Sequence, residues 1–356
     1  MPWARKYEGA RDFGGVQIVN CAVIWFEKTL GELTAREWFG VFRLRSEVFV
    51  VEQDCVYLDM DDKDAQSIHL GAMVEDAALG NAARAVVRLV PPGISYPEPS
   101  IGRVAIDLEA RGSGLGVELM ERAIRACNRH WPGCAIRISA QQYLVSFYER
   151  LGFVQVGEGY LEDGIPHIEM LREWRGFEFY KDEWRAAREA FAESLESLPA
   201  ESLQGTSEQW GGLQVLEHLR MSEAGFWRYL MKKCQAHPAE LSKTDMASDF
   251  RGWQLIQALH SDRRWKDPTP GQALTPTGNL EAPLQAILVE WKAEQDHGFT
   301  SVQEVMNDAD WWGVQVFNHP LAGRISLADA FGFGAAHIRH HLHQLNRLNS
   351  QTLAKS

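Results

Sequence analysis

Cysteine is scarce in this chain of 356 residues, and the five cysteines that are present form no pattern. They are Cys21, Cys55, Cys127, Cys134 and Cys234, an odd number without a C-x-x-C pair. A disulfide framework uses an even set and a thiolate zinc site uses closely spaced pairs, so neither is indicated. No apolar run is long enough to span a bilayer, and the first residues lack the basic-then-apolar pattern of a signal peptide. We therefore expect a cytoplasmic protein.

Positively charged residues are also few in this sequence compared with negatively charged ones. Lys and Arg number 36 against 48 Asp and Glu, which gives a formal net charge of -12. Nucleic acids and anionic membranes attract proteins through clustered Lys and Arg, so this balance argues against both as partners. Internal repeats and low-complexity tracts are missing as well. The length favours two domains, and 45% hydrophobic with 24% charged residues is typical of soluble globular chains.

A glycine-rich turn between an apolar strand and an amphipathic helix is the most informative feature that is present. Within Ile101–Met120, the residues Arg111, Gly114 and Gly116 are spaced as R-x-x-G-x-G. Glycines let the backbone approach a ligand, and the N-terminus of the following helix adds unpaired N–H donors. The turn lacks both the Gly-Lys-Ser/Thr ending of a P-loop and the G-x-G-x-x-G dinucleotide spacing. It predicts binding of another phosphate or pyrophosphate ligand, with a tight turn that binds nothing as the alternative.

Two later segments place this turn in a larger pattern. Residues 135–140 read as a second buried strand, and Phe147–Phe153 reads F-Y-x-x-x-G-F. The turn and this signature resemble the GNAT acetyltransferases, and residues 49–57 and 162–168 resemble the ElaA-like branch of that family. The resemblance covers roughly Trp25 to Arg172. It implies an α/β fold with a mixed, mostly antiparallel sheet flanked by helices, and acetyl-CoA as the cosubstrate.

The resemblance also implies roles for particular residues. Those expected to bind the coenzyme are Val104, Ala105, Ile106, Arg111, Gly112, Ser113, Gly114, Leu115, Gly116 and Gln141. Tyr148 stands where the family often places the general acid that protonates the departing thiolate, and aromatic packing is the alternative reading. Glu52 is the first candidate for the general base and His167 the second. Either of them could instead be a structural hydrogen-bond partner, with a water chain removing the proton.

The second half of the chain has a helical pattern, and strand-like runs disappear after Arg172. Four segments read as helices, namely 180–198, 213–233, 280–305 and 326–348. That number of helices predicts an up-and-down four-helix bundle. We therefore expect a flexible extension over residues 1–22, an α/β domain over 23–174 and an all-α domain over 177–356.

Histidines concentrate near the C-terminus, where residues 336–345 read AHIRHHLHQL. On a helix, His337 and His341 are one turn apart and border the apolar stripe. His340 and His343 point about 140° or more from that stripe, towards solvent. The 337/341 pair is therefore the one that can converge on a single ion.

A third ligand is implied by a second resemblance. The segment Trp210–His218 and the turn at residues 317–323 resemble the DinB-like (YfiT-like) metal-binding bundle family. This resemblance implies His218, His337 and His341 as ligands of a divalent transition metal. Three imidazoles suit Zn, Ni, Fe or Mn. The apolar stripe around His218 does not itself select that residue, so capping or packing between helices is the alternative.

Together these features predict an acetyl-CoA-dependent N-acyltransferase that acts on an amine of a small molecule or peptide and is fused to a metal-binding helical domain. Two alternatives remain open. The helical domain could be a metal-dependent thiol S-transferase, which would make the protein bifunctional. The chain could instead be a CoA-binding sensor with a non-catalytic binding or oligomerisation module. Homodimerisation is also left open.

Overall fold

The computed structural model describes residues 23–76, 80–206, 209–233, 235–260, 275–276, 282–306, 309–320 and 322–353. The flexible extension expected over residues 1–22 lies outside these described residues. The chain divides into two compact units. The described residues up to Arg88 and Arg103–Leu119 form one unit; Leu89–Gly102 and the described residues from Met120 onward form the other.

A mixed β-sheet organises the first half of the chain, as the sequence predicts. Its strands are β1 (Ile24–Thr29), β2 (Ile68–Asp76), β3 (Gly80–Val90), β4 (Ser100–Ile106), β5 (Ile136–Gln141), β6 (Val154–Gln155), β7 (Tyr160–Glu162) and β8 (Ile165–Arg172). The strand order is β1-β2-β3-β4-β5-β8-β6, with β7 paired to β8. Strand β4 runs parallel to β5, whereas β1 is antiparallel to β2, and β5, β6 and β7 are antiparallel to β8.

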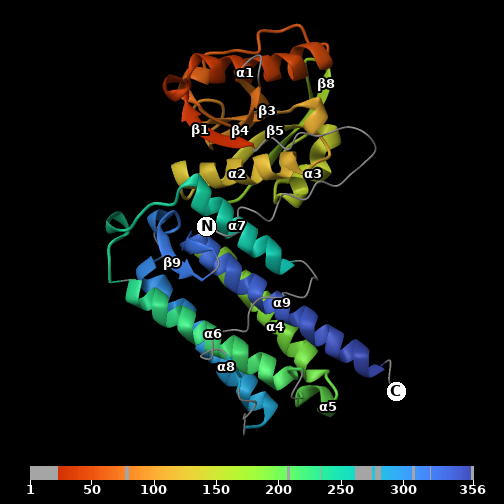
Figure 1. The fold of residues 1–356 in the computed structure, drawn as a ribbon, viewed down its shortest axis with the longest axis vertical. Helices are drawn as coiled ribbons and strands as arrows, with labels where there is room; N and C mark the ends of the chain where they lie inside the picture. Colours follow the sequence, from red (N-terminus) through yellow and green to blue (C-terminus); the bar gives the residue numbers. More distant parts are fainter. Residues whose placement is uncertain are drawn as a thin grey trace. The chain divides into compact units, whose positions relative to one another are not determined.

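Helix α1 (Ala35–Arg45) begins at a capping box and covers part of this sheet (Figure 1). The Thr34 hydroxyl accepts the N–H of Glu37 at 3.3 Å, and the Glu37 carboxylate accepts the N–H of Thr34 at 2.8 Å. Val41 and Leu44 on its inner face are buried in one cluster with side chains of β1 to β4. The helix therefore gains its stability from a defined start and from one buried apolar face.

The helical path continues beyond α1 as a π-helix over Ser46–Glu52, which is wound more loosely than α1. A π-helical turn shifts which face each side chain occupies. Here it ends at Glu52, an exposed residue that belongs to the site described below.

Helix α3 (Val145–Arg150) lies between β5 and β6, and the chain after Arg172 is mainly helical. The helices of this second half are α4 (Phe177–Glu196), α5 (Ala200–Leu203), α6 (Gly212–Lys233), α7 (Met246–His260), α8 (Leu284–Met306) and α9 (Leu327–Leu353). Long helices α4, α6, α8 and α9 lie where the sequence predicts them. Helix α7 is not among the four segments that the sequence predicts as helices. The hairpin of β9 (Gln315–His319) and β10 (Gly323–Ser326) was not expected either, because the pattern after Arg172 indicated no strands. Short strands with a mixed polar sequence give little periodic signal.

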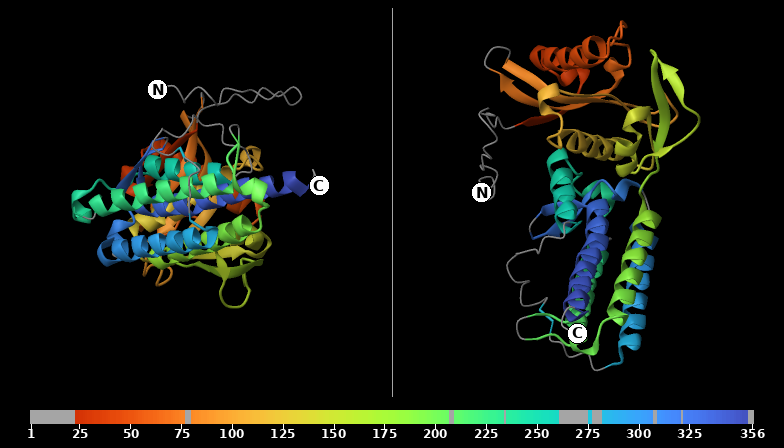
Figure 2. Two further views of the ribbon diagram at one scale, coloured as in Figure 1. Left: turned by 90° about the horizontal axis from the view of Figure 1, so that it is seen from below. Right: turned by 90° about the vertical axis from the view of Figure 1, so that its right-hand side faces the viewer.

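The long helices pack against one another through large aromatic side chains. Helix α4 contacts α8 and α9, and α6 also contacts both (Figure 2). Trp184 of α4 is buried and donates its indole N–H to the carbonyl of Phe331 on α9 at 2.6 Å. A β-carbon on Gly334 would lie 1.7 Å from the Trp184 ring, so only glycine permits this approach of α4 to α9. None of the helices in the described residues combines the length and apolar content needed to cross a membrane.

Candidate functional site

The glycine-rich loop between β4 and α2 (Leu115–His130) has a backbone that its glycines make accessible. Gly112 and Gly114 have φ of +74° and +92°, a region that other residues rarely adopt. A β-carbon on either would meet nothing within 4 Å. Gly116 has no positive φ, and a β-carbon there would make only an ordinary contact of 3.8 Å with Ile106. No neighbouring atom of the described residues therefore requires glycine at position 116, which leaves room for a ligand.

Hydrogen bonds within the loop fix how it enters helix α2. The Ser113 hydroxyl donates to the carbonyl of Ala110 at 2.7 Å. The N–H groups of Val117 and Glu118 both donate to the carbonyl of Gly114 at 3.1 Å. The first turn of α2 thus directly follows the two left-handed glycines. The positive end of its dipole and its N-terminal amides favour an anion at this position.

Arg111 places its guanidinium against two other predicted site residues. It makes a bidentate ion pair with Glu52, with Nη1–Oε1 and Nη2–Oε2 distances of 2.7 and 2.6 Å. Its Nε donates to the carbonyl of Ile106 at 3.2 Å. The hydrogen bonds from Arg111 lower the pKa of Glu52. The side chains of Arg111 and Glu52 are 38% and 43% exposed, so the pair lies at the surface of its unit.

Strand β4 carries the other predicted coenzyme contacts of this unit. Val104 and Ile106 are partly exposed, whereas Ala105 is fully buried in the cluster with α1. Arg103, directly before them, has a φ of +51°, which is uncommon for a residue other than glycine. An irregular residue inside a strand re-aims the backbone groups that follow it. The residues around Arg103 contain no signal for a left-handed backbone, so the sequence does not predict this conformation.

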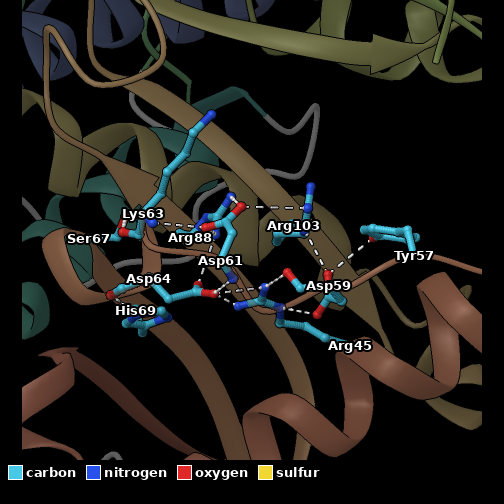
Figure 3. A network of polar contacts seen from close by, with 10 residues as sticks. All are labelled: Arg45, Tyr57, Asp59, Asp61, Lys63, Asp64, Ser67, His69, Arg88 and Arg103. Carbon is cyan, nitrogen blue, oxygen red and sulfur yellow. Dashed lines mark hydrogen bonds and ion pairs between the residues drawn. The ribbon is translucent and has the colours of Figure 1, made fainter. Parts of the chain in front are cut away.

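A buried network of arginines and aspartates holds the segment between α1 and β2 (Figure 3). Arg45 of α1, which is 1% exposed, donates to Asp59 at 2.8 Å and to Asp64 at 2.7 Å. Arg88 of β3 donates to Asp61 at 2.6 Å and to Asp64 at 3.0 Å. Each buried charge therefore has partners of opposite sign, as burial of ions requires.

The same network reaches the irregular residue of β4. Asp59 Oδ1 accepts hydrogen bonds from Arg103 Nε at 2.7 Å and from the Tyr57 hydroxyl at 3.1 Å. The Arg103 guanidinium lies over the rings of Phe49 and Tyr57, at 5.9 and 5.4 Å from their centroids. The side chain of Arg103 is thus restrained from several directions, which supports its unusual backbone conformation. The acidic run at positions 59–64 was the signal in the sequence that could have indicated this network.

Acid should weaken this network through Asp64. Burial alone would raise the pKa of Asp64, but the hydrogen bonds and charge of Arg45 outweigh it and lower this pKa to about 2. A lowered folded-state pKa stabilises the fold above the unfolded value and loses that contribution as pH falls through the folded value. We expect a loss on the order of 2 kcal/mol between about pH 4 and pH 2, measured by urea unfolding. The Asp64→Asn variant should show a shallower pH dependence over this window, and equal slopes would contradict the assignment.

The second unit carries Tyr148, the predicted general acid. It lies on α3, is 6% exposed, and packs edge-on against Phe147 and Phe153 at centroid distances of 5.1 and 6.1 Å. Burial, with a smaller contribution from Tyr143, raises the pKa of Tyr148 to about 12. The phenol therefore keeps its proton at neutral pH and is available as a hydrogen-bond donor. The aromatic contacts fit the alternative packing role, and the acid role of Tyr148 stays a prediction.

Gln141 and His167 face each other across the second unit's strands. They are register partners in the antiparallel pair of β5 and β8. His167 Nδ1 lies 2.9 Å from the carbonyl of Ile165, which can only accept, so Nδ1 is the donor in this contact. Tyr160 is also opposite His167 and stacks on its ring at 6.1 Å. The structure thus brings a predicted coenzyme contact next to the second base candidate.

The three histidines predicted as metal ligands converge in the second unit. His218 of α6 and His337 and His341 of α9 have ring nitrogens that all lie within 4.8 Å of one another. His337 Nε2 and His341 Nε2 are 3.1 Å apart. In a tetrahedral zinc site with Zn–N bonds of about 2.0–2.1 Å, neighbouring ligand nitrogens are about 3.3 Å apart. The spacing and the all-imidazole donor set therefore fit a transition-metal ion.

Hydrogen bonding orients His341, and burial favours the neutral form of both His337 and His341. His341 Nδ1 donates to the Gln344 side-chain carbonyl at 2.9 Å, which leaves its Nε2 lone pair facing His337. Burial, with the nearby His218, lowers the pKa of His341 to about 3. Burial and His341 lower the pKa of His337 well below its usual value. Neutral imidazoles are the form that binds metals.

The other two C-terminal histidines differ from expectation. His340 and His343 are partly buried rather than turned to open solvent. Helix α7 packs along α9, and the backbone of Leu259 lies within hydrogen-bonding reach of His340. The sequence does not predict α7, and the face of α9 that α7 covers is therefore expected from the sequence to be exposed to solvent.

Comparisons with known proteins agree with the geometry of the first half of the chain. A family model described as an acetyltransferase (GNAT) domain matches residues 49–173. A UPF0039 protein of Synechocystis is 40% identical over 147 residues, 41% of this chain and 93% of the relative. Protein ElaA of Escherichia coli is 35% identical over 151 residues, 42% of this chain and 95% of the relative. A solved acyl-CoA N-acyltransferase from Pseudomonas aeruginosa is 42% identical, covering 42% of this chain and 99% of its own, with a TM-score of 0.39.

The mixed sheet and these matches define the protein as an acyltransferase. Within that class, the chain belongs to the GNAT acetyltransferase family and is ElaA-like over the matched part.

Proposed function

We propose that the protein transfers the acetyl group of acetyl-CoA to an amine of a small molecule or peptide. The observation that carries this proposal is the loop after β4. Gly112 and Gly114 are left-handed, and Gly116 is a glycine that no described neighbour requires. Such a loop at a helix N-terminus suits the diphosphate of coenzyme A. Arg111 and Ser113 extend the same loop, and Leu115 opens α2 behind it.

Each of these residues has a proposed role in the reaction. The amine nitrogen attacks the thioester carbonyl carbon, the carbon–sulfur bond breaks, the thiolate gains a proton and the amine loses one. Backbone groups of Val104, Ala105 and Ile106 bind the pantetheine arm and the thioester oxygen. Tyr148 donates the proton to the thiolate, which its protonated state allows. Glu52 is our first candidate to take the amine proton, and His167 is the second.

We further propose that the domain boundaries follow the sequence, with the acetyltransferase domain at residues 23–174 and a DinB-like bundle at 177–356. The convergence of His218, His337 and His341 supports a metal site in that bundle. Zn, Ni, Fe or Mn would fit three neutral imidazoles. A divalent metal held there would lower the pKa of a bound thiol or water. That chemistry favours a thiol S-transferase as the candidate second activity, and thiol consumption with an electrophile would test it.

Acetyl-CoA binding to the loop can be tested with a pair of glycine variants. Gly114→Ala should weaken acetyl-CoA binding about tenfold in calorimetry, because alanine strains the left-handed backbone and displaces the amides. Gly93→Ala is the matched control, since Gly93 has a φ of +84° and also meets nothing within 4 Å. Both variants should lose stability alike, and only Gly114→Ala should lose affinity. Wild-type protein that gives no binding heat would reject the proposed function.

A further inference from the structure

The guanidinium of Arg111 pairs with the proposed base Glu52 and with a backbone carbonyl that the proposed function assigns to coenzyme binding. Arg111 belongs to the loop that would hold the diphosphate, yet its charge is spent on Glu52 through two hydrogen bonds of 2.7 and 2.6 Å. Its Nε also donates a hydrogen bond to the carbonyl of Ile106, a backbone acceptor that would otherwise bind an amide N–H of the pantetheine arm. Arg111 therefore directs its donors to partners within the protein, Glu52 and the Ile106 carbonyl.

We propose that Arg111 is an exchangeable side chain that binds Glu52 and the Ile106 carbonyl in the free enzyme, and moves to the diphosphate when acetyl-CoA binds. The inference rests on the proposed function and adds a link between donor binding and Glu52. Once the guanidinium moves, the Glu52 carboxylate loses both of its hydrogen bonds. Glu52 is then a positioning residue for Arg111 in the free enzyme and a released carboxylate in the complex.

The exposure of the pair makes the exchange feasible. The two side chains are 38% and 43% exposed, and ion pairs at such positions contribute little to stability. A diphosphate offers more negative charge than one carboxylate and suits the planar fork of arginine. It would also lie at the N-terminus of α2, where the helix dipole favours it. The coenzyme is therefore the stronger partner for the guanidinium.

Release of Glu52 has a chemical consequence. In the free enzyme the hydrogen bonds from Arg111 lower the pKa of Glu52, which makes this carboxylate a poor proton acceptor. Loss of these bonds, together with a negative diphosphate nearby, raises the pKa. A carboxylate with a higher pKa accepts a proton from the amine more readily. Glu52 would thus become an effective base only in the presence of the acetyl donor.

Acetyl-CoA titration of Glu52→Gln by calorimetry tests the exchange. The variant should bind about two- to fivefold more tightly than wild type, because the diphosphate no longer competes with a carboxylate for Arg111. Glu47→Gln is a matched control. Glu47 lies in the same π-helix and pairs with Arg43 at 2.8 Å, with side chains 47% and 50% exposed. The control should bind like wild type.

A double-mutant cycle separates exchange from simple charge repulsion. In an Arg111→Gln background, Glu52→Gln should no longer tighten binding by the same factor, since no guanidinium is released. Equal tightening in both backgrounds would overturn the exchange, as would unchanged or weaker binding by Glu52→Gln in the wild-type background.

A second readout follows the carboxylate itself. Carbon-13 NMR of labelled glutamate, with Glu52→Gln to identify the resonance, should show the pKa of Glu52 rising when CoA is added. A pKa that falls or stays constant would contradict the release of Glu52. Wild-type protein that fails to bind acetyl-CoA would instead reject the proposed function itself, so the two failures are distinguishable.

Discussion

His341→Ala is expected to abolish metal binding at the proposed histidine site in the C-terminal part of the protein. His341 lies on α9, is 8% exposed, and its Nε2 is 3.1 Å from that of His337. Removal of one of three imidazoles leaves a bidentate pair of His218 and His337, which binds far more weakly. We expect metal affinity to fall by at least about 100-fold, the upper range for loss of even an outer-shell partner. Elemental analysis of purified protein and a competitive chelator titration would measure this.

His343→Ala is the matched control for that experiment. His343 lies on the same helix and is partly buried, but it is not one of the three clustered histidines. Its variant should keep the wild-type metal content and affinity. Metal content that is unchanged in His341→Ala, or equally reduced in both variants, would reject the assigned ligands. Thermal unfolding with and without chelator would show whether the metal stabilises the wild type but not the His341 variant.

Tyr148→Phe should lower kcat by about 100-fold, at the lower end of the range for loss of a general acid. The pKa of Tyr148, raised to about 12, favours this smaller decrease in kcat, because a phenol this weakly acidic transfers its proton with little driving force. Phenylalanine keeps the edge-on contacts with Phe147 and Phe153, so the melting temperature should change little. Release of coenzyme A from acetyl-CoA, followed with a thiol reagent and a panel of amines, measures the rate.

Tyr143→Phe provides the control for the loss of a nearby hydroxyl. Tyr143 precedes α3 by two residues and is 75% exposed, and its proximity contributes to the raised pKa of Tyr148. Its removal should leave kcat within about twofold of wild type, as is usual for exposed side chains. Undiminished turnover in Tyr148→Phe would remove this residue from the mechanism and leave it the packing role.

The local motifs of the acetyltransferase part could be predicted from the sequence. The spacing of Arg111, Gly114 and Gly116 indicates a phosphate loop because glycine conformations and helix N-termini are local properties. The structure has left-handed glycines directly before α2, and phosphate binding stays a prediction. The partner of Arg111 could not be predicted, since Glu52 lies 59 positions away in the chain. Long-range ion pairs depend on how the strands and helices meet, which periodicity does not encode.

The long helices of the second half could also be predicted, because their pattern is local. The elements that the prediction missed have a physical explanation. Long amphipathic helices such as α4, α6, α8 and α9 repeat their apolar positions often enough to be recognised. The β9–β10 hairpin is short, and α7 covers a face of α9 that was expected to meet solvent. Exposure of a helix face is a property of its neighbours, so His340 was assigned to the wrong environment.

By itself, the sequence determined the segments with regular periodicity, the glycine loop and the pair of histidines one helical turn apart, because each depends on neighbours within a few residues. Only the tertiary structure decided which distant groups meet. It brought His218 to His337 and His341, closed the Arg45 network around Asp59 and Asp64, and placed Arg111 on Glu52. These contacts join residues far apart in the chain, and their energies exist only once the backbone has folded.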